Sequence, residues 1–334
     1  MKSLGIILLT LACSSTLLGQ AKTGTSVGQF LMIEPSARIA AMDNAGATMY
    51  GELQAAYYNP AAIGLMELHS VQFTHSPWLA DISFDYAALG LVLGKFGNLY
   101  ASVTSLNSGE IDVRTVEQPL GTGERYTVSN LAFGIGYGKQ ISEKFSLGMQ
   151  VTYLQETIWH SSLSAFGFNV GTIYRISESG LHIGASVSNF GTRAKFDGRD
   201  LRIQYDQDPR KFGDNGSLPA SLFTENFPLP VLFRVGVSMP FTFGEDHKLT
   251  VVLDAFHPSD NPESVSMGTE YTFMNTFSLR GGYQQLFLQD SEVGLTLGAG
   301  VQYQMPDYRL SFDYAWADHG RLEKTHRFTL GVLF

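Results

Sequence analysis

Cysteine is almost absent from this chain. The only one, Cys13, lies within the first 20 residues, where Lys2 precedes an apolar run from Leu4 to Leu11. A positive start followed by a short apolar core is typical of a secretory signal peptide, and we predict one over residues 1–20. The mature chain would then hold no thiol, which excludes disulfides and thiol chemistry. The alternative is a lipoprotein acylated at Cys13, although Thr10 stands where such signals usually have leucine.

Charge is scarce, and long apolar runs are missing. Charged residues make up 16% of the chain, against about a quarter in a typical soluble domain. Beyond residue 20, no apolar run approaches the roughly 18 residues of a membrane-spanning helix. Low charge combined with 12% aromatic residues is typical of a transmembrane β-barrel. The net charge of −9 argues against a nucleic acid partner, because a phosphate backbone attracts basic surfaces.

Sequence motifs for catalysis and cofactor binding are also missing. The eight histidines are scattered, without HExxH or similar metal spacing, and there is no GxSxG and no P-loop. The glycines of residues 134–138 follow a strand pattern and do not open a helix, so they do not form a nucleotide loop. We therefore expect a non-enzymatic protein with no catalytic residues, no metal site and no cofactor.

What the chain does have is an alternation of apolar and polar residues from Leu68 onward. Leu131, Phe133, Ile135 and Tyr137, for example, alternate with alanine and glycines. This period of two is that of a β-strand. About fourteen such segments occur, each about ten residues long, which suits strands that cross a bilayer at a tilt. The later ones are residues 181–187, 233–239, 249–253, 265–273, 277–283, 293–303, 310–316 and 328–334.

These segments predict an all-β fold, an antiparallel transmembrane β-barrel of about 14 strands over residues 67–334. The last strand alternates from Phe328 to a terminal Phe334, and pairing it with the first strand would remove both free sheet edges. A C-terminal aromatic residue also resembles the signal that the bacterial outer-membrane assembly machinery recognises. The alternative is the terminal strand of a soluble β-sandwich.

The lengths of the connections support the barrel. Every second connection is short and polar, whereas the two long ones, residues 107–126 and 191–228, fall among the alternate connections. Bacterial barrels have short periplasmic turns and long extracellular loops, so we expect both long segments outside the cell. The expected location is the cell outer membrane, with the lipid bilayer as one partner.

Several charged residues occur within the strand segments. A charge at the centre of a bilayer costs about 2–4 kcal/mol, so these residues should point into the lumen. We expect them, together with Arg38 of the N-terminal segment, to form a network of ion pairs that rigidifies the barrel; a ligand or substrate path is the alternative. The strand residues concerned are Asp85, Arg234, Asp254, Glu270, Arg280 and Asp313.

The long segment 191–228 combines charges with aromatic residues. At this length a connection is usually functional. It forms either a lid over the barrel mouth or a surface that docks a partner through Tyr205, Phe212, Phe223 and Phe227. A short tip at Pro77, Trp78 and Leu79 is expected to anchor at the membrane interface.

Residues 21–66 do not alternate and are too polar to face lipid. Ser36 can cap a short helix through Arg38 to Met42, and the plug motif Asn59, Pro60 and Ala61 is a turn signal that can begin another helical turn. We predict that this plug-like segment, partly helical, sits in or under the lumen.

This N-terminal segment resembles a known family. Residues 28–33, 35–42 and 57–64 are similar to the opening of the PorV/PorQ family of outer-membrane barrels, which serve the type IX secretion system. That family is related to FadL-type fatty-acid channels, whose barrel has fourteen strands and an N-terminal plug. The motifs are specific only for this wider superfamily.

The resemblance implies that the protein binds or shuttles exported cargo at the cell surface, with secreted cargo or other secretion-system proteins as partners. By analogy, the extracellular loops and the barrel mouth would make the contact. The alternative function is a FadL-like channel for hydrophobic small molecules. The small polar residues expected in the lumen weaken that alternative without excluding it.

Overall fold

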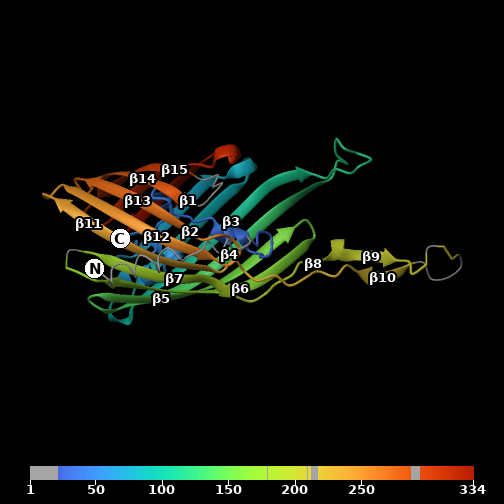
Figure 1. Cartoon of the computed structure of the whole chain (residues 1–334), viewed down its shortest axis with the longest axis horizontal. Coiled ribbons are helices and arrows are strands. Elements are labelled where there is room, and N and C mark those ends of the chain that lie inside the picture. Colours follow the sequence, from blue (N-terminus) through green and yellow to red (C-terminus); the bar gives the residue numbers. More distant parts are fainter. Residues whose placement is uncertain (1–21, 179, 209, 212–216, 287–293) are drawn as a thin grey trace, which may run out of the picture.

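The computed structural model describes residues 22–178, 180–208, 210–211, 217–286 and 294–334, and most of them lie in strands (Figure 1). The predicted signal peptide with Cys13 falls outside these residues. The barrel strands are β1 (Ser70–Pro77), β2 (Ser83–Val92), β3 (Asn98–Asp112), β4 (Arg125–Ser142), β5 (Phe145–Ile158), β6 (Ser161–Arg175), β7 (His182–Gly191), β11 (Leu232–Phe243), β12 (His247–Pro258), β13 (Ser264–Phe273), β14 (Phe277–Leu286), β15 (Leu295–Gln304), β16 (Arg309–Asp318) and β17 (Lys324–Leu333).

These fourteen strands form one closed antiparallel sheet in which neighbours in the sequence are neighbours in the wall. The barrel closes where β1 pairs with β17, with His75 opposite Phe328 and Ser70 opposite Leu333. The predicted barrel is confirmed, and the two-sheet sandwich is excluded.

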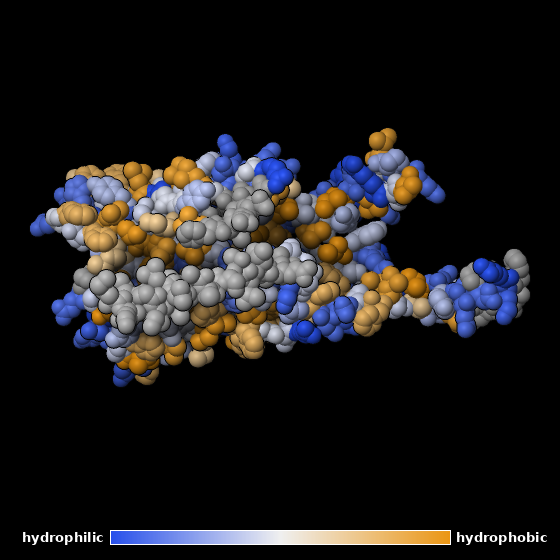
Figure 2. All heavy atoms as spheres, viewed as in Figure 1, coloured by the Kyte–Doolittle hydropathy of each residue, from blue (hydrophilic) through white to orange (hydrophobic). Residues whose placement is uncertain are grey.

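The outer wall is apolar where the alternation predicted it. On β4, Phe133 and Ile135 are exposed on the outside, whereas Ala132 and Gly134 face the buried interior. Exposed apolar side chains recur over most of the barrel strands and make up much of the outer surface in Figure 2. An apolar exterior of this kind suits contact with lipid chains.

The face assignment of β2 is the main correction to the sequence analysis. Phe84 and Tyr86 point into the barrel and are fully buried, whereas Asp85 points outward. The Asp85 carboxylate pairs there with His75 of β1, its register partner, at 2.7 Å. Apolar residues occupy both faces of β2, so the alternation could not say which face was inside. The pairing with β1 decides it.

The two ends of the barrel differ in their connections. The turns on the side of the C-terminal residue are short, and two long hairpins project from the opposite end (Figure 1). One is the β3–β4 hairpin. The other is the arm, residues 197–222, which contains β8 (Asp197–Gly198), β9 (Arg202–Tyr205) and β10 (Leu218–Ser221). The end with long connections is the extracellular one. Because the arm extends away from the barrel, it does not form the lid that was one expectation.

Residues 22–66, the plug, occupy the lumen. The plug contains four short helices, η1 (Gln29–Met32), α2 (Ala37–Ala40), α3 (Ala55–Tyr58) and η2 (Pro60–Leu65). Ser36 caps α2 as predicted, because its hydroxyl accepts a hydrogen bond from the Ile39 N–H at 3.0 Å. Single turns of 3₁₀ helix in the connections are η3 (Leu79–Asp81), η4 (Gly94–Phe96), η5 (Arg199–Leu201) and η6 (Gly320–Leu322).

Within the described residues, none of the helices has the length and hydropathy needed to cross a membrane.

Candidate functional site: the plugged lumen

The plug motif fastens the plug to the barrel wall through Asn59. Its side-chain oxygen accepts from the Ala61 N–H at 3.0 Å and so caps η2. Its amide nitrogen donates to the Ala47 carbonyl at 2.6 Å and to the Thr172 carbonyl of β6 at 3.0 Å. The Ser146 hydroxyl of β5 donates to the Ala61 carbonyl at 2.7 Å. One fully buried asparagine therefore ties two turns of the plug to each other and to the wall.

Glycines on the inner wall allow the plug to approach this closely. A Cβ at Gly148 would overlap the Pro60 carbonyl, one at Gly171 would overlap Asn59, and one at Gly184 would overlap the Ala47 carbonyl. The glycines at these three positions thus form the surface of the inner wall against which the plug packs, which we call the glycine bed.

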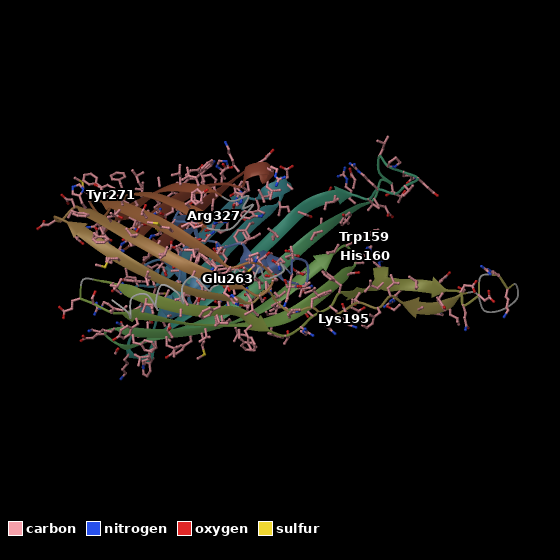
Figure 3. All side chains as sticks on the ribbon, viewed as in Figure 1. Trp159, His160, Lys195, Glu263, Tyr271 and Arg327 are labelled. Atoms are coloured by element: carbon pink, nitrogen blue, oxygen red, sulfur yellow. The ribbon has the colours of Figure 1, made fainter. Side chains whose placement is uncertain are left out.

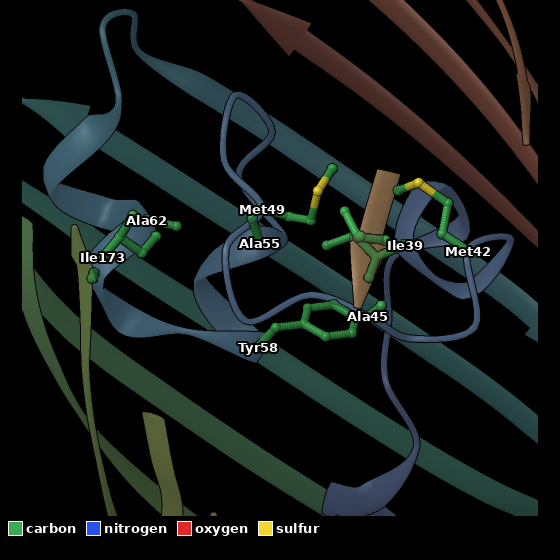
Figure 4. Close-up of a cluster of buried hydrophobic side chains, with 10 residues drawn as sticks. Ile39, Met42, Ala45, Met49, Ala55, Tyr58, Ala62 and Ile173 are labelled. Atoms are coloured by element: carbon green, nitrogen blue, oxygen red, sulfur yellow. The ribbon is translucent and has the colours of Figure 1, made fainter. Parts of the chain in front are cut away.

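The plug has an apolar core of its own, which also contacts the wall. Ile39, Met42 and Tyr58 pack with alanines of the plug and with Ile173 of β6 (Figure 4). The Arg234 guanidinium of β11 and the Ser186 hydroxyl of β7 both donate to the Tyr58 carbonyl at 2.9 Å.

Four of the predicted lumen charges meet in one buried network. Arg38 of the plug donates to both carboxylate oxygens of Glu270, from Nη2 at 2.7 Å and from Nε at 2.8 Å. Arg280 donates from Nε to Glu270 at 2.7 Å and from Nη1 to Asp313 at 2.6 Å. All four side chains are buried or nearly so, and paired ions of this kind hold plug and wall in one arrangement.

The other two inward charges, on the neighbouring strands β11 and β12, form a second group. Arg234 pairs with Glu34 of the plug, and its guanidinium lies 5.3 Å from the Tyr58 ring centre and 5.1 Å from that of Phe256. Asp254 accepts from the Ala47 N–H at 2.7 Å. Asp85, on the outer wall, belongs to neither group.

Sequence reasoning missed the plug's own acids and one arginine of the wall. Glu34 and Glu52 are buried, and Glu52 accepts from the Ser36 hydroxyl at 2.6 Å. They lie in the segment without alternation, so no pattern placed them inside. Arg327 of β17 does alternate with Phe328, and its side chain is buried with the guanidinium carbon 5.6 Å from the Trp78 ring centre (Figure 3).

The aromatic residues proposed for partner docking differ in their exposure to solvent. Tyr205 is 49% exposed on the arm, and Phe223 just beyond it is 85% exposed. Phe227 instead packs inward against a core cluster that includes Phe30 and Leu229. Phe212 lies outside the described residues.

The base of the arm is attached to the turn between β5 and β6. The His160 side chain lies 2.9 Å from one Asp200 carboxylate oxygen, and its backbone N–H donates to the other at 3.2 Å. Partial desolvation acts to raise the pKa of Asp200, but these bonds outweigh it and lower that pKa. Trp159 stacks on His160 beside the arm (Figure 3).

An apolar seam runs along one side of the lumen between the plug and the wall of β2 and β3. Its wall side is formed by Phe84, Tyr86 and Tyr100, and its plug side includes Leu53 and Ile63. Tyr57 of the plug meets Tyr86 edge to face at 5.7 Å, and the Tyr86 and Tyr100 hydroxyls hydrogen-bond to each other. The lumen is therefore not uniformly polar, which corrects the sequence-based expectation.

The seam joins two cavities. At the extracellular end it reaches Trp78, which lines the mouth cavity of about 380 Å³. At the periplasmic end it reaches Leu53 and Met66, which line a cavity of about 220 Å³. An apolar contact surface thus extends from one cavity to the other and is closed in this structure by side-chain packing.

Among the described residues, no three histidine, cysteine or carboxylate side chains are grouped so that they could hold a metal ion.

A closed fourteen-stranded barrel with an apolar exterior and a filled lumen is an outer-membrane protein. The comparison with family models finds no match to this chain, and the comparison with curated proteins finds none either.

Solved structures share the fold. The toluene transporter TodX of Pseudomonas putida superposes with a TM-score of 0.57 at 14% identity, over 90% of this chain and 97% of TodX. The toluene transporter TbuX of Ralstonia pickettii gives 0.54 at 13% identity, over 90% and 97%. A FadL homologue of Pseudomonas aeruginosa gives 0.52 at 11%, over 87% and 95%. These similarities show the FadL-like barrel fold, and none of them points to the PorV/PorQ family.

Proposed function

We propose that this protein is an outer-membrane channel for small hydrophobic molecules, with the plug as its gate. The observation that carries the proposal is the apolar seam, which links the mouth cavity at Trp78 to the periplasmic cavity at Leu53 and Met66. A hydrophobic solute can follow such a surface without losing apolar contact, and burial of apolar area stabilises it by about 25 cal/mol per Å².

The neighbours in fold support the same proposal. TodX and TbuX are described as toluene transporters, and their barrels cover nearly the whole of this chain. At 14% and 13% sequence identity these similarities show the fold alone. The proposed channel function therefore rests on the apolar seam of this chain.

Uptake measured in a bacterial host that lacks its own hydrocarbon channel tests the proposal. Expression of the protein should raise the uptake of radiolabelled toluene across the outer membrane. The variant Phe84→Ser should lower that uptake several-fold, because it replaces a fully buried apolar side chain near the mouth end of the seam by a hydroxyl.

The matched control is Leu89→Ser on the same strand, which changes the outer wall and should leave uptake unchanged. Both variants are first checked for barrel assembly by their heat-dependent gel mobility. Uptake equal to that of the empty host, or equal loss in both variants, would refute a route along the seam.

The second candidate is a role in type IX secretion, binding or shuttling cargo at the cell surface. The arm favours it, because Tyr205 is exposed on this hairpin, which projects beyond the barrel (Figure 1), and Phe223 is exposed just after it. Exposed aromatic side chains of this kind are frequent anchors in protein interfaces.

Replacing residues 197–223, which include both Tyr205 and Phe223, by a short glycine-serine linker tests this role. The deletion keeps the bridge between Ala194 and Phe227, so the barrel should still assemble. Cargo with a C-terminal secretion domain should then accumulate in the periplasm, while hydrocarbon uptake stays at the wild-type level. Normal delivery of cargo to the surface would speak against secretion as the function.

A further inference from the structure

The mouth cavity is lined by both aromatic rings and carboxylates. It lies between the plug, the tip after β1, the β12–β13 connection and the β16–β17 connection, with a volume of about 380 Å³. Trp78 and Phe256 supply aromatic surface, while Glu34 and Asp43 of the plug supply carboxylates. The volume is within the range of small-molecule sites, and the lining is about half polar and half apolar.

Asp43 is the unusual member of this cavity. Its side chain is completely buried, yet neither carboxylate oxygen has a hydrogen-bond partner in standard geometry. The neighbouring Ser266 hydroxyl offsets only part of the cost of burial. Burial of a carboxylate without a charged partner is strongly unfavourable and favours its protonated form, so a cationic ligand that donates a hydrogen bond there would stabilise the ionised carboxylate in its place.

The charges around the cavity favour a positive ligand over a neutral one. Three carboxylates, those of Glu34, Asp43 and Asp254, lie at this end of the lumen, against the two guanidiniums of Arg234 and Arg327. Arg234 forms an ion pair with Glu34. One oxygen of Asp254 accepts from a backbone N–H while the other has no partner, but Asp254 does not line the cavity. Asp43 is thus the cavity carboxylate without a cationic partner, and it can pair with an added cation.

Aromatic rings at this mouth already contact cations. The Arg327 guanidinium lies 5.6 Å from the Trp78 ring centre, and the Arg234 guanidinium lies 5.1 Å from that of Phe256. Ring faces attract positive charge, most strongly where water is excluded. His319, the other titratable side chain lining the cavity, meets Trp78 edge to face, with its ring centre at 5.6 Å.

We propose that the mouth cavity binds small organic cations, an ammonium group carried on an apolar or aromatic body, with the Asp43 carboxylate as the counter-ion. The apolar body lies against Trp78 and Phe256, and the ammonium group donates to Asp43. A metal ion is disfavoured, since the described residues hold no group of three suitable ligands. The proposal concerns binding and does not depend on transport through the seam.

Isothermal titration of the purified full-length protein in detergent tests it with benzylamine as the probe. Benzyl alcohol and benzoate serve as the neutral and anionic analogues of the same shape. Benzylamine should bind more tightly than either analogue. The variant Asp43→Asn should weaken benzylamine binding at least about tenfold, because loss of one partner of a buried charge pair typically costs that much or more.

The matched control is Glu263→Gln, which removes a carboxylate from the same rim (Figure 3). Glu263 is exposed, pairs with His257 and does not line the cavity, so benzylamine affinity should not change. Asp43→Asn keeps a side-chain oxygen that can accept from the neighbouring Ser266 hydroxyl, so it should assemble normally. As a second readout, benzylamine should change the tryptophan fluorescence of the wild type and much less that of Trp78→Phe.

Three results would overturn the assignment. The first is no heat of binding for benzylamine at millimolar concentration. The second is equal or tighter binding of benzoate or benzyl alcohol, since a free guanidinium or a simple hydrogen bond would then define the site. The third is an Asp43→Asn variant with wild-type affinity.

Discussion

The variant Gly148→Val should open the pore. A Cβ at this position would overlap the carbonyl of Pro60, and backbone atoms of the plug cannot move aside as a flexible side chain does. Overpacking typically costs about 1–3 kcal/mol or more, and each 1.4 kcal/mol changes a population about tenfold. The plug should therefore be displaced from the glycine bed in a much larger fraction of molecules than in the wild type. Ion conductance in planar lipid bilayers should rise at least about tenfold over the wild type.

The control for this prediction is Gly281→Val on β14. A Cβ there has no neighbour closer than 3.7 Å, so conductance should stay at the wild-type level. If Gly148→Val assembles and remains closed, the glycine bed is not what positions the plug. Limited proteolysis distinguishes the two cases, because a displaced plug becomes accessible to protease.

The variant Arg280→Met should destabilise the barrel strongly. Arg280 bridges Glu270 and Asp313, and its removal leaves Asp313 buried without a cationic partner, whereas Glu270 keeps Arg38. Breaking a buried ion pair in this way typically costs about 3–5 kcal/mol. The midpoint of urea unfolding, measured by tryptophan fluorescence in detergent, should fall markedly.

The double variant Arg280→Met with Asp313→Leu should recover much of this loss, because the uncompensated charge is gone. Arg125→Met provides the surface comparison. Arg125 pairs with Glu110 and Asp112 on the exposed β3–β4 hairpin, where such pairs contribute about 0–1 kcal/mol. Similar losses for Arg280→Met and Arg125→Met would mean that the lumen network does not stabilise the fold.

Strand alternation was sufficient to predict the closed barrel, and the connection lengths supported it. Alternation predicts the strands because one face of each strand contacts lipid and the other faces the lumen, so the same apolar-to-polar pattern recurs along the chain. It failed on β2, where Phe84 and Tyr86 on the inside oppose Ala87 and Leu89 on the outside. With both faces apolar, only the strand pairing could decide which residues line the seam.

The plug could not be derived from the sequence in the same way. Its residues have no period, and their partners are distant in the chain, as for Glu34 with Arg234 or Ala47 with Asp254. Contacts of this kind depend on how the wall closes around the segment. Five of the six strand charges predicted to point inward do so, whereas Asp85 points outward. Which acids of the plug meet the inward charges could not be predicted. Phe227 shows the same limit, since an aromatic residue in a loop can point outward or into the core.

The joint between the first and last strands has a consequence for biogenesis. Thr74 of β1 and Thr329 of β17 share a hydrogen bond at 2.6 Å across that joint. Gln54 of the plug donates to Thr74 at 2.7 Å, and the Ala37 N–H donates to Thr329 at 3.1 Å. Hydrogen bonds from the plug therefore help to hold the joint between β1 and β17 together. We therefore expect plug insertion and closure of the β1–β17 joint to depend on each other, and a barrel without its plug to be weakest at this joint.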